Sequence, residues 1–313
     1  MLFQSAFPDQ HQLPAAAFLH KIMVPQIIDI AVILIAIATM LAIGLELRID
    51  ALKRVQNLWR NLLVPLALLI LIPPLVGLGC VGLLQPGPAV AATILLISAC
   101  PIGDVANLYT LLARGNPALS FFLNAFTCIV APLTMALTLP FLARASGIDE
   151  TFSVPGLSLV LRLLLYIACP VVVGMLWRSW KSGAIRCSLW LQNFSAVLIL
   201  SVICLILIDQ KTEILEFGFH AAFTSSTYIL ITLGIGLLIV RILRLPHDAA
   251  SVVSLCFPVR NLAVASIVAV SLMKRLDYAA IIAIYFVIEV PALLVFSFIL
   301  RRTQRNPKTS PQT

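Results

Sequence analysis

Charged side chains are scarce in this chain of 313 residues, where Asp, Glu, Lys and Arg together make up only 11%. Soluble globular domains carry roughly 25% of these residues and about 45–50% apolar ones, whereas apolar residues here reach 61%. The chain therefore lacks the polar surface of a water-soluble domain, and its composition predicts a membrane protein. Nucleic-acid binding is not expected, because the basic residues behind the net charge of +8 cluster at the ends of apolar runs and form no single stripe.

Histidine and paired cysteine are missing from the places where site chemistry would need them. None of the 4 His lies in the interior of a long apolar run, and the 7 Cys form no C-x-x-C pair. A zinc site of the usual spacing and an intramembrane catalytic constellation are therefore not predicted, so we expect neither an enzyme nor a bound cofactor. Residues 1–22 hold no basic region ahead of an apolar one, and no cleaved signal peptide is expected.

Long apolar runs dominate what is present. A helix needs about 20 residues to cross a hydrocarbon core of about 30 Å. Nine runs meet this requirement: 24–47, 61–84, 89–113, 117–143, 157–177, 188–208, 220–243, 248–273 and 278–301. The sequence predicts an all-α polytopic membrane protein with about nine transmembrane helices in residues 23–301, between an extracytoplasmic segment at 1–22 and a cytoplasmic tail at 302–313.

The basic residues predict the orientation of these spans. Lys and Arg accumulate in short cytoplasmic loops. Alternate loops and the C-terminal tail contain fourteen of the 21 Lys and Arg residues, and the opposite side contains five. We therefore expect the N-terminus outside and the C-terminus in the cytoplasm of a cell membrane, either the plasma membrane or a bacterial inner membrane.

Two of the spans are interrupted by residues that break helices. The third contains CPIGDVAN at 100–107 and the eighth contains CFPVRN, ending at Asn261, at 256–261. The interruptions are five spans apart, an odd number, so the units around them cross the membrane in opposite directions. An inverted repeat with one discontinuous helix in each half is typical of secondary transporters, whose sites lie where the two breaks meet. Pro and Gly often only kink membrane helices, but two charged breaks at related positions favour a binding site.

Three ionisable residues lie in the middle of spans, where charge is costly and usually functional. They are Asp104 and Arg260 in the two breaks and Glu289 in the last span. Asp104 and Arg260 are predicted to lie near each other if the breaks cross. Two interpretations are open: a structural ion pair that locks the crossing, or a pair that opens when substrate or a proton arrives. Glu289 is either a proton-titrating site or a hydrogen-bonded structural residue.

Residues 100–120, CPIGDVANLYTLLARGNPALS, resemble the bile acid:sodium symporter family, which has C-P-G-G-T-x-S-N followed by an apolar run and L-A-[RK]-G-[DN]-x-A-L-S. The matching residues are Cys100, Pro101, Gly103, Asn107, Leu112, Ala113, Arg114, Gly115, Asn116, Ala118, Leu119 and Ser120. MLAIGLELRIDALKRV at 40–55 is similar to the G-x-x-L end of an early helix of that family. The resemblance implies nine or ten helices with two crossed discontinuous ones. It implies a core domain (61–143 and 220–301) that moves against a panel domain (24–47 and 157–208), and uptake of organic anions coupled to sodium.

The sequence departs from this family at the positions that bind sodium. For the first sodium site, the resemblance assigns Asn107 and Ser120 as retained ligands, with Asn124 in place of Thr and Cys256 in place of Glu. For the second site, Cys256 and Arg260 replace a Glu-x-x-x-Gln pair, and Leu69 takes the position of a Gln. A hard cation needs oxygen ligands and is repelled by a guanidinium, so the second site is expected to be lost.

These departures lead to the hypothesis that Arg260 permanently supplies the positive charge that sodium supplies in relatives. Asp104 would balance it in the empty state and an anionic substrate in the bound state. The predicted function is alternating-access transport of small organic anions, carboxylates or sulfonates resembling bile acids, with altered or absent sodium coupling and Na+ or H+ as coupling ion. The alternative is a metalloid exporter similar to arsenite permeases, with a thiolate of Cys100 or Cys256 at a break. The other interpretation of these two cysteines is that they are small, inert packing residues.

Overall fold

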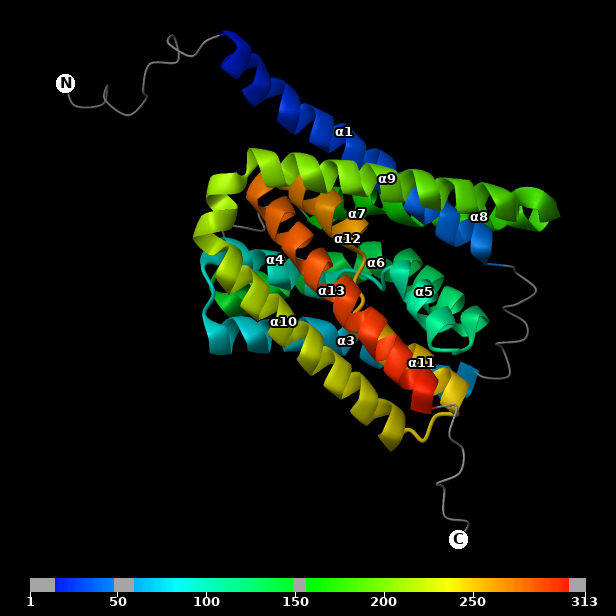
Figure 1. The fold of residues 1–313 in the computed structure, drawn as a ribbon. Coiled ribbons are helices and arrows are strands. Elements are labelled where there is room, and N and C mark those ends of the chain that lie inside the picture. Colours follow the sequence, from blue (N-terminus) through cyan, green and yellow to red (C-terminus); the bar gives the residue numbers. More distant parts are fainter. Residues whose placement is uncertain (1–14, 48–58, 149–155, 304–313) are drawn as a thin grey trace.

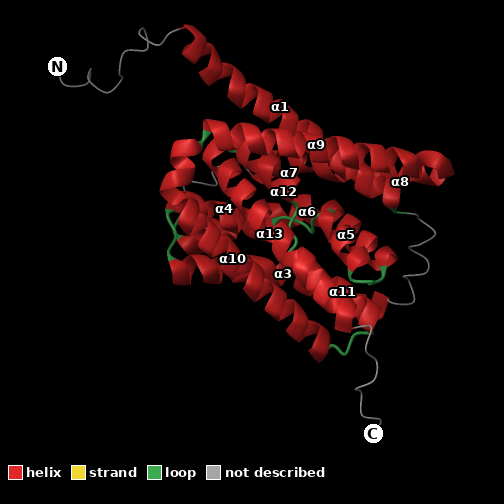
Figure 2. Ribbon diagram, viewed as in Figure 1, coloured by secondary structure: helices red, strands yellow, loops and turns green. Residues whose placement is uncertain are grey.

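The computed structural model describes residues 15–47, 59–148 and 156–303, and these residues are almost entirely helical (Figure 2). Within these ranges there is no strand, and the single β-bridge joins Ile102 to Arg260. Among the described residues, seven helices are long and apolar enough to cross a membrane, and two further apolar helices, Pro88–Ala99 and Leu262–Leu272, are shorter. The prediction of an all-α polytopic membrane protein is confirmed.

The elements follow the predicted spans in order. They are α1 (Ala15–Glu46), α3 (Trp59–Leu84), α4 (Pro88–Ala99), α5 (Val105–Leu112), α6 (Pro117–Ser146), α7 (Gly156–Leu163), α8 (Cys169–Trp180), α9 (Ile185–Asp209), α10 (Lys211–Ile242), α11 (His247–Cys256), α12 (Leu262–Ser266) and α13 (Leu276–Thr303). Two stretches of π-helix, η2 (Leu164–Ala168) and η4 (Ile267–Leu272), and the short 3-10 turn η3 (Ser182–Ala184) complete them. Residues 1–14 and 304–313, most of the predicted N-terminal segment and tail, lie outside the described residues.

The two interrupted spans are discontinuous helices, as predicted. Helix α4 ends at Ala99, Cys100 has extended backbone with ψ of 154°, and α5 begins only at Val105. Helix α11 likewise ends at Cys256, and α12 begins at Leu262. Each break contains a proline, which lacks the N–H that a continuing helix would use, and the chain therefore leaves the helical path there.

Helices α1, α8 and α9 lie together along one side of the molecule, α3 and α10 lie on the opposite side, and α13 runs diagonally between them (Figure 1). We call α1, α7, α8 and α9 the panel and the remaining helices the core. Within the panel, a Cβ atom on Gly44 would lie 2.1 Å from the carbonyl oxygen of Val171, and one on Gly174 would lie 2.5 Å from that of Leu41. Only glycine permits this backbone contact between α1 and α8. Movement of the core against the panel stays a prediction.

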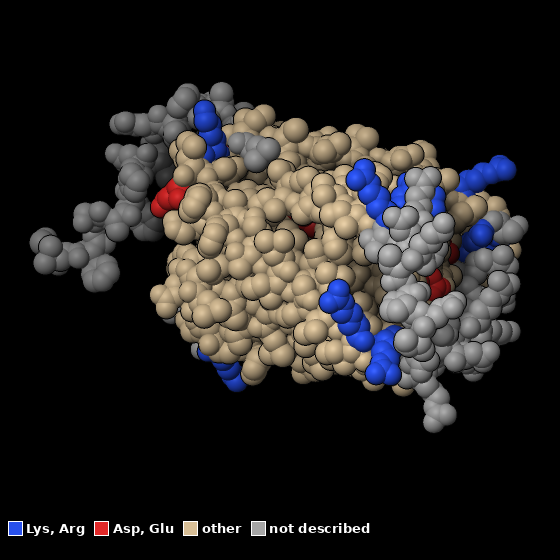
Figure 3. All heavy atoms as spheres, turned by 60° about the horizontal axis from the view of Figure 1, so that its bottom comes forward, with Lys and Arg blue, Asp and Glu red and all other residues tan. Residues whose placement is uncertain are grey.

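The surface fits a lipid environment. Figure 3 shows a wide band with almost no charged side chains, with Lys and Arg gathered toward its ends. Large apolar side chains of α3 and α10 are strongly exposed, including Leu83, Leu215 and Phe219 at 77–83% of their full area. Exposed apolar surface of this extent marks contact with lipid, and the helical backbone leaves no polar group unpaired there.

Candidate functional site

The two breaks cross and are joined by backbone hydrogen bonds. The N–H of Gly103 donates to the carbonyl oxygen of Val259 at 3.3 Å, and the N–H of Asn261 donates to that of Pro101 at 2.8 Å. A Cβ atom on Gly103 would lie 2.7 Å from the carbonyl oxygen of Arg260, so a glycine is required at this crossing. Polar backbone that the breaks expose inside the membrane is thus paired between the two repeats.

Arg260 lies at the centre of this crossing and is 3% exposed. Its guanidinium donates five hydrogen bonds, all to backbone carbonyl oxygens: Nε and Nη2 to Phe257 at 3.2 and 2.7 Å, Nη2 to Cys256 at 3.2 Å, and Nη1 to Cys100 at 3.2 Å and Leu69 at 3.4 Å. Three of these carbonyls stand at the C-terminal ends of α4 and α11. A helix C-terminus carries about half a negative charge. Two such ends therefore offset roughly one positive charge, that of the guanidinium.

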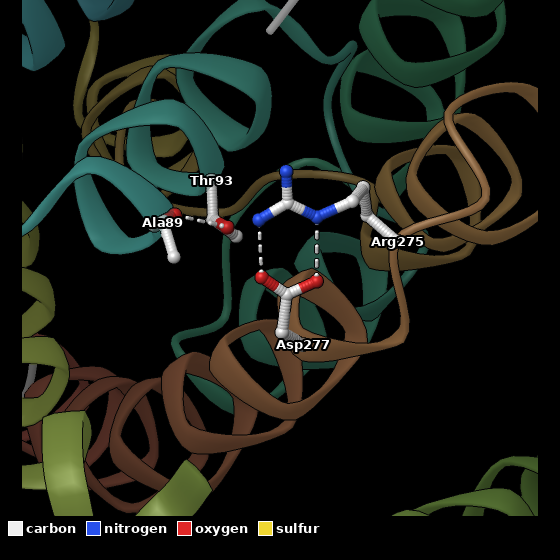
Figure 4. Close-up of polar contacts among 4 residues, drawn as sticks. All are labelled: Ala89, Thr93, Arg275 and Asp277. Atoms are coloured by element: carbon white, nitrogen blue, oxygen red, sulfur yellow. Dashed lines mark hydrogen bonds and ion pairs between the residues drawn. The ribbon is translucent and has the colours of Figure 1, made fainter. Parts of the chain in front are cut away.

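Asp104 is not the ion-pair partner of Arg260. In the described ranges the ion pairs are Lys274 with Asp29 at 2.8 Å and Arg275 with Asp277 at 2.6 Å. The second pair is bidentate, with Arg275 Nε and Nη2 each donating to one carboxylate oxygen of Asp277 (Figure 4). These hydrogen bonds raise the pKa of Arg275 above its ordinary value. The backbone carbonyls, and not Asp104, balance Arg260 in this conformation.

A cavity of about 80 Å³ separates the panel from the crossing. Its panel wall, from α1 and α9, is apolar apart from Thr39. On the core side the breaks and α13 contribute most of the polar lining: Asp104, Arg260, Ser266 and Glu289. The structure thus brings the three predicted mid-span charges to one cavity, between the two domains that the sequence predicted to move.

Glu289 is buried in this cavity wall with 3% of its surface exposed. Its Oε1 atom has no hydrogen-bond partner among the described residues. One turn earlier on α13, the hydroxyl of Tyr285 donates to the carbonyl oxygen of Pro258 at 2.8 Å and ties the helix to the second break. Helix α13 therefore holds Glu289 against the crossing.

The candidate ligands of the first sodium site are only partly together. Ser120 Oγ donates to Asn107 Oδ1 at 2.7 Å and accepts from Thr110 Oγ1 at 3.3 Å, so these side chains of α5 and α6 form one buried group. Asn124, one turn further along α6, accepts from Cys128 Sγ at 3.4 Å, and its Nδ2 has no partner in the described part of the chain. Asn261 caps α12 by accepting from the N–H of Val264 at 3.1 Å.

Sequence reasoning missed Glu46, at the end of α1. Its Oε2 accepts from Asn107 Nδ2 at 3.5 Å, and its Oε1 accepts from Ser188 Oγ at 3.3 Å and from Gln192 Nε2. Glu46 thus links the panel helices α1 and α9 to α5 of the core. The only available signal was the acidic residue in GLEL, which looks like an ordinary span end facing the interface.

The two break cysteines are buried, with 2% of Cys100 and none of Cys256 exposed. Cys100 Sγ donates to the carbonyl oxygen of Leu96 at 3.2 Å, and both thiols are free of disulfides. Neither lines the cavity at the crossing. Among the described residues no group of three or more His, Cys, Asp or Glu side chains could hold a metal ion.

The residues at the second sodium site do not fit a sodium ion. A guanidinium occupies the carbonyl oxygens of Cys256 and Leu69, and these positions carry a thiol and an aliphatic chain where a carboxylate and an amide would be needed. The first site keeps the oxygen atoms of Asn107 and Ser120, but Cys256 brings no carboxylate to it. The fit there is incomplete.

The sequence matches one protein-family profile and several curated transport proteins. The profile of the "Sodium Bile acid symporter family" matches residues 31–217, more than half of the chain. The chain is 31% identical over 167 residues to a "Probable sodium/metabolite cotransporter BASS1, chloroplastic" from Oryza sativa subsp. japonica, covering 53% of this chain and 40% of that protein. It is 26% identical over 184 residues to the "Uncharacterized sodium-dependent transporter YocS" of Bacillus subtilis (strain 168), covering 57% and 54%, respectively.

The human "P3 protein" is 26% identical over 263 residues, which cover 82% of this chain and 55% of that protein. The chain thus spans between two fifths and just over half of the length of these curated relatives.

Proposed function

Because the chain belongs to the sodium bile acid symporter family, we propose that it is a secondary transporter that moves small organic anions across a membrane by alternating access. The relatives named as a sodium/metabolite cotransporter and a sodium-dependent transporter support a transport function. So does the geometry, since two crossed discontinuous helices face a cavity at the boundary between panel and core.

The observation that carries the mechanism is the coordination of Arg260. Its guanidinium donates to the carbonyl oxygens of Leu69 and Cys256, the two other positions at which the second sodium site is altered. A permanent cation therefore takes the place of a cation that would enter and leave. Arg260 holds the crossing together without sodium, because a guanidinium is a permanent cation in proteins.

This replacement changes the stoichiometry of coupling. A second sodium ion has no place beside the guanidinium, and the first site retains only part of its ligands around Asn107 and Ser120. We therefore propose uniport, exchange or proton coupling in place of two-sodium symport. The N-terminus faces outward and the C-terminus the cytoplasm of a cell membrane, as the bias of basic residues indicates.

Transport in proteoliposomes tests this function. Labelled pyruvate, succinate and taurocholate represent a small monocarboxylate, a dicarboxylate and a sulfonated bile acid. Each is loaded as counter-substrate, and a sodium gradient or a proton gradient is imposed separately. We expect exchange of at least one anion that needs no sodium and is lost in Arg260→Gln, whereas the charge-retaining Arg260→Lys keeps part of it. Strictly sodium-dependent uptake, or unchanged exchange by Arg260→Gln, would refute the proposal.

A further inference from the structure

The cavity at the crossing holds more negative charge than positive charge. Asp104 and Glu289 both line it, and Arg260 is the one basic residue in its lining. The guanidinium is already offset by the carbonyl oxygens at the ends of α4 and α11. With both carboxyl groups ionised, the cavity is negative before any substrate enters, and an organic anion would be repelled from it.

Of the two carboxyl groups, Glu289 is the better candidate for the one that binds a proton. It is 3% exposed, lines the cavity, and has an Oε1 atom without a hydrogen-bond partner in the described ranges. An ionised carboxylate buried in this way is costly, because an unpaired charge loses its hydration and gains nothing. A neutral carboxyl group loses most of that cost and presents an O–H donor to the cavity.

The other charged and ionisable groups near Glu289 do not remove the excess of negative charge in the cavity. Those that interact with it electrostatically come from both breaks, α5, α10 and α13: Asp104, Arg260, Tyr109, Tyr228 and Tyr285. The phenols are neutral at physiological pH. Asp104 adds repulsion, and Arg260 is held by carbonyls. The panel wall formed by α9 contributes only apolar side chains to the cavity.

We propose that Glu289 is the proton-coupling residue of this transporter, and that it takes up one proton for each organic anion that enters the cavity. This inference rests on the proposed function and names its coupling ion. The proton binds a carboxylate oxygen of Glu289 and cancels the charge that would otherwise oppose the anion. When the cavity opens to the other side, the anion and the proton leave together, and the carboxylate is restored.

The test distinguishes loss of proton coupling from loss of anion transport. In proteoliposomes, the member of the pyruvate, succinate and taurocholate panel that exchanges fastest is offered with an acidic exterior and a neutral lumen. For electroneutral one-to-one coupling, a gradient of about one pH unit supports about tenfold accumulation. In Glu289→Gln we expect exchange to continue and the accumulation to vanish, since an amide is permanently neutral. Asp277→Asn, on the same helix but outside the cavity, is the matched control and keeps both activities.

Several outcomes would overturn the inference. Acid-driven accumulation by Glu289→Gln would assign the proton to another group, and accumulation by the wild type that follows only sodium would remove the proton altogether. Absence of exchange in every protein would instead reject the proposed function.

A spectroscopic measurement that needs no substrate keeps the assignment of Glu289 testable when no anion is exchanged or when the variant fails to fold. Infrared difference spectra of the wild-type protein should show the C=O band of a protonated carboxyl group that disappears on titration to alkaline pH and is missing in Glu289→Gln. A wild type without this band at any pH, or a band that persists in the variant, would contradict the assignment.

Discussion

Replacing Arg260 by glutamine and Cys256 by glutamate, together with Leu69→Gln, gives the chain the three side chains with which relatives are expected to bind a second sodium ion. The single change Arg260→Gln removes a guanidinium that satisfies four buried carbonyl oxygens. Each unsatisfied buried acceptor costs about 1–3 kcal/mol. Even the lower figure gives a loss of about 4 kcal/mol in the free energy of unfolding.

The triple variant should recover part of this loss, but only with sodium present. A ligand that binds the folded state alone stabilises it by about 2.7 kcal/mol at 100 times its dissociation constant. Thermal unfolding in detergent, in sodium chloride against choline chloride at equal ionic strength, measures the difference. We expect a sodium-dependent rise in Tm for the triple variant that exceeds any rise in the wild type and in Arg260→Gln.

The reasoning fails under two results. If Arg260→Gln unfolds at the temperature of the wild type, the guanidinium does not hold the crossing. If the triple variant responds to sodium no more than the wild type, the position of Arg260 is not that of a cation site, and the equivalence between arginine and sodium is wrong.

Three further predictions follow from single contacts. Gly103→Ala should cost about 1–3 kcal/mol and weaken transport, because its Cβ would lie 2.7 Å from a backbone oxygen of the opposite break. Thermal unfolding measures this, and Gly79→Ala, where the new Cβ meets nothing within 4 Å, is the control. Cys100→Ala should leave anion exchange and growth on arsenite unchanged, since the buried thiol donates its hydrogen bond to its own helix and does not line the cavity. The swap of Asp29→Lys with Lys274→Asp should restore transport that either single change impairs.

Each of these has a result that would contradict it. A Gly103→Ala protein as stable as Gly79→Ala would show that the crossing yields easily. Arsenite tolerance that requires Cys100 would favour the metalloid exporter. A double swap that transports no better than the single variants would mean that the Asp29 contact is incidental.

The fold was largely predictable because its signals are local. In the described residues, seven of the nine apolar runs hold a helix long enough to cross a membrane, and Pro101 and Pro258 mark the breaks in the other two. The predicted interruption at 100–107 was too long at its end, since α5 begins at Val105. The π-helical stretches at 164–168 and 267–272 were not predicted, because they leave the apolar pattern unchanged.

The site was less predictable, because its partners lie far apart in the chain. Asp104 was the natural partner for Arg260 on charge alone, but the guanidinium binds backbone oxygens, one of them 191 residues away at Leu69. Every residue has a carbonyl, so sequence gives no sign of which ones a side chain will meet. Glu46 was overlooked for a related reason: an acidic residue near a span end normally faces the interface.

Helix α1 contacts the core through two carboxylates, Asp29 about halfway along the helix and Glu46 at its end. Asp29 binds Ser271 and Lys274, whose side chain is 67% exposed, whereas Glu46 meets Asn107 in a half-buried setting. If the core moves against the panel as predicted, a rigid helix held at two points must release one of these contacts. At physiological ionic strength the Debye length is about 8 Å, and salt screens the interaction of exposed charges much more than that of buried pairs. We therefore expect rising ionic strength to weaken the Asp29 contact more than the Glu46 contact and, if the core moves as predicted, to shift the balance between the two orientations of the cavity.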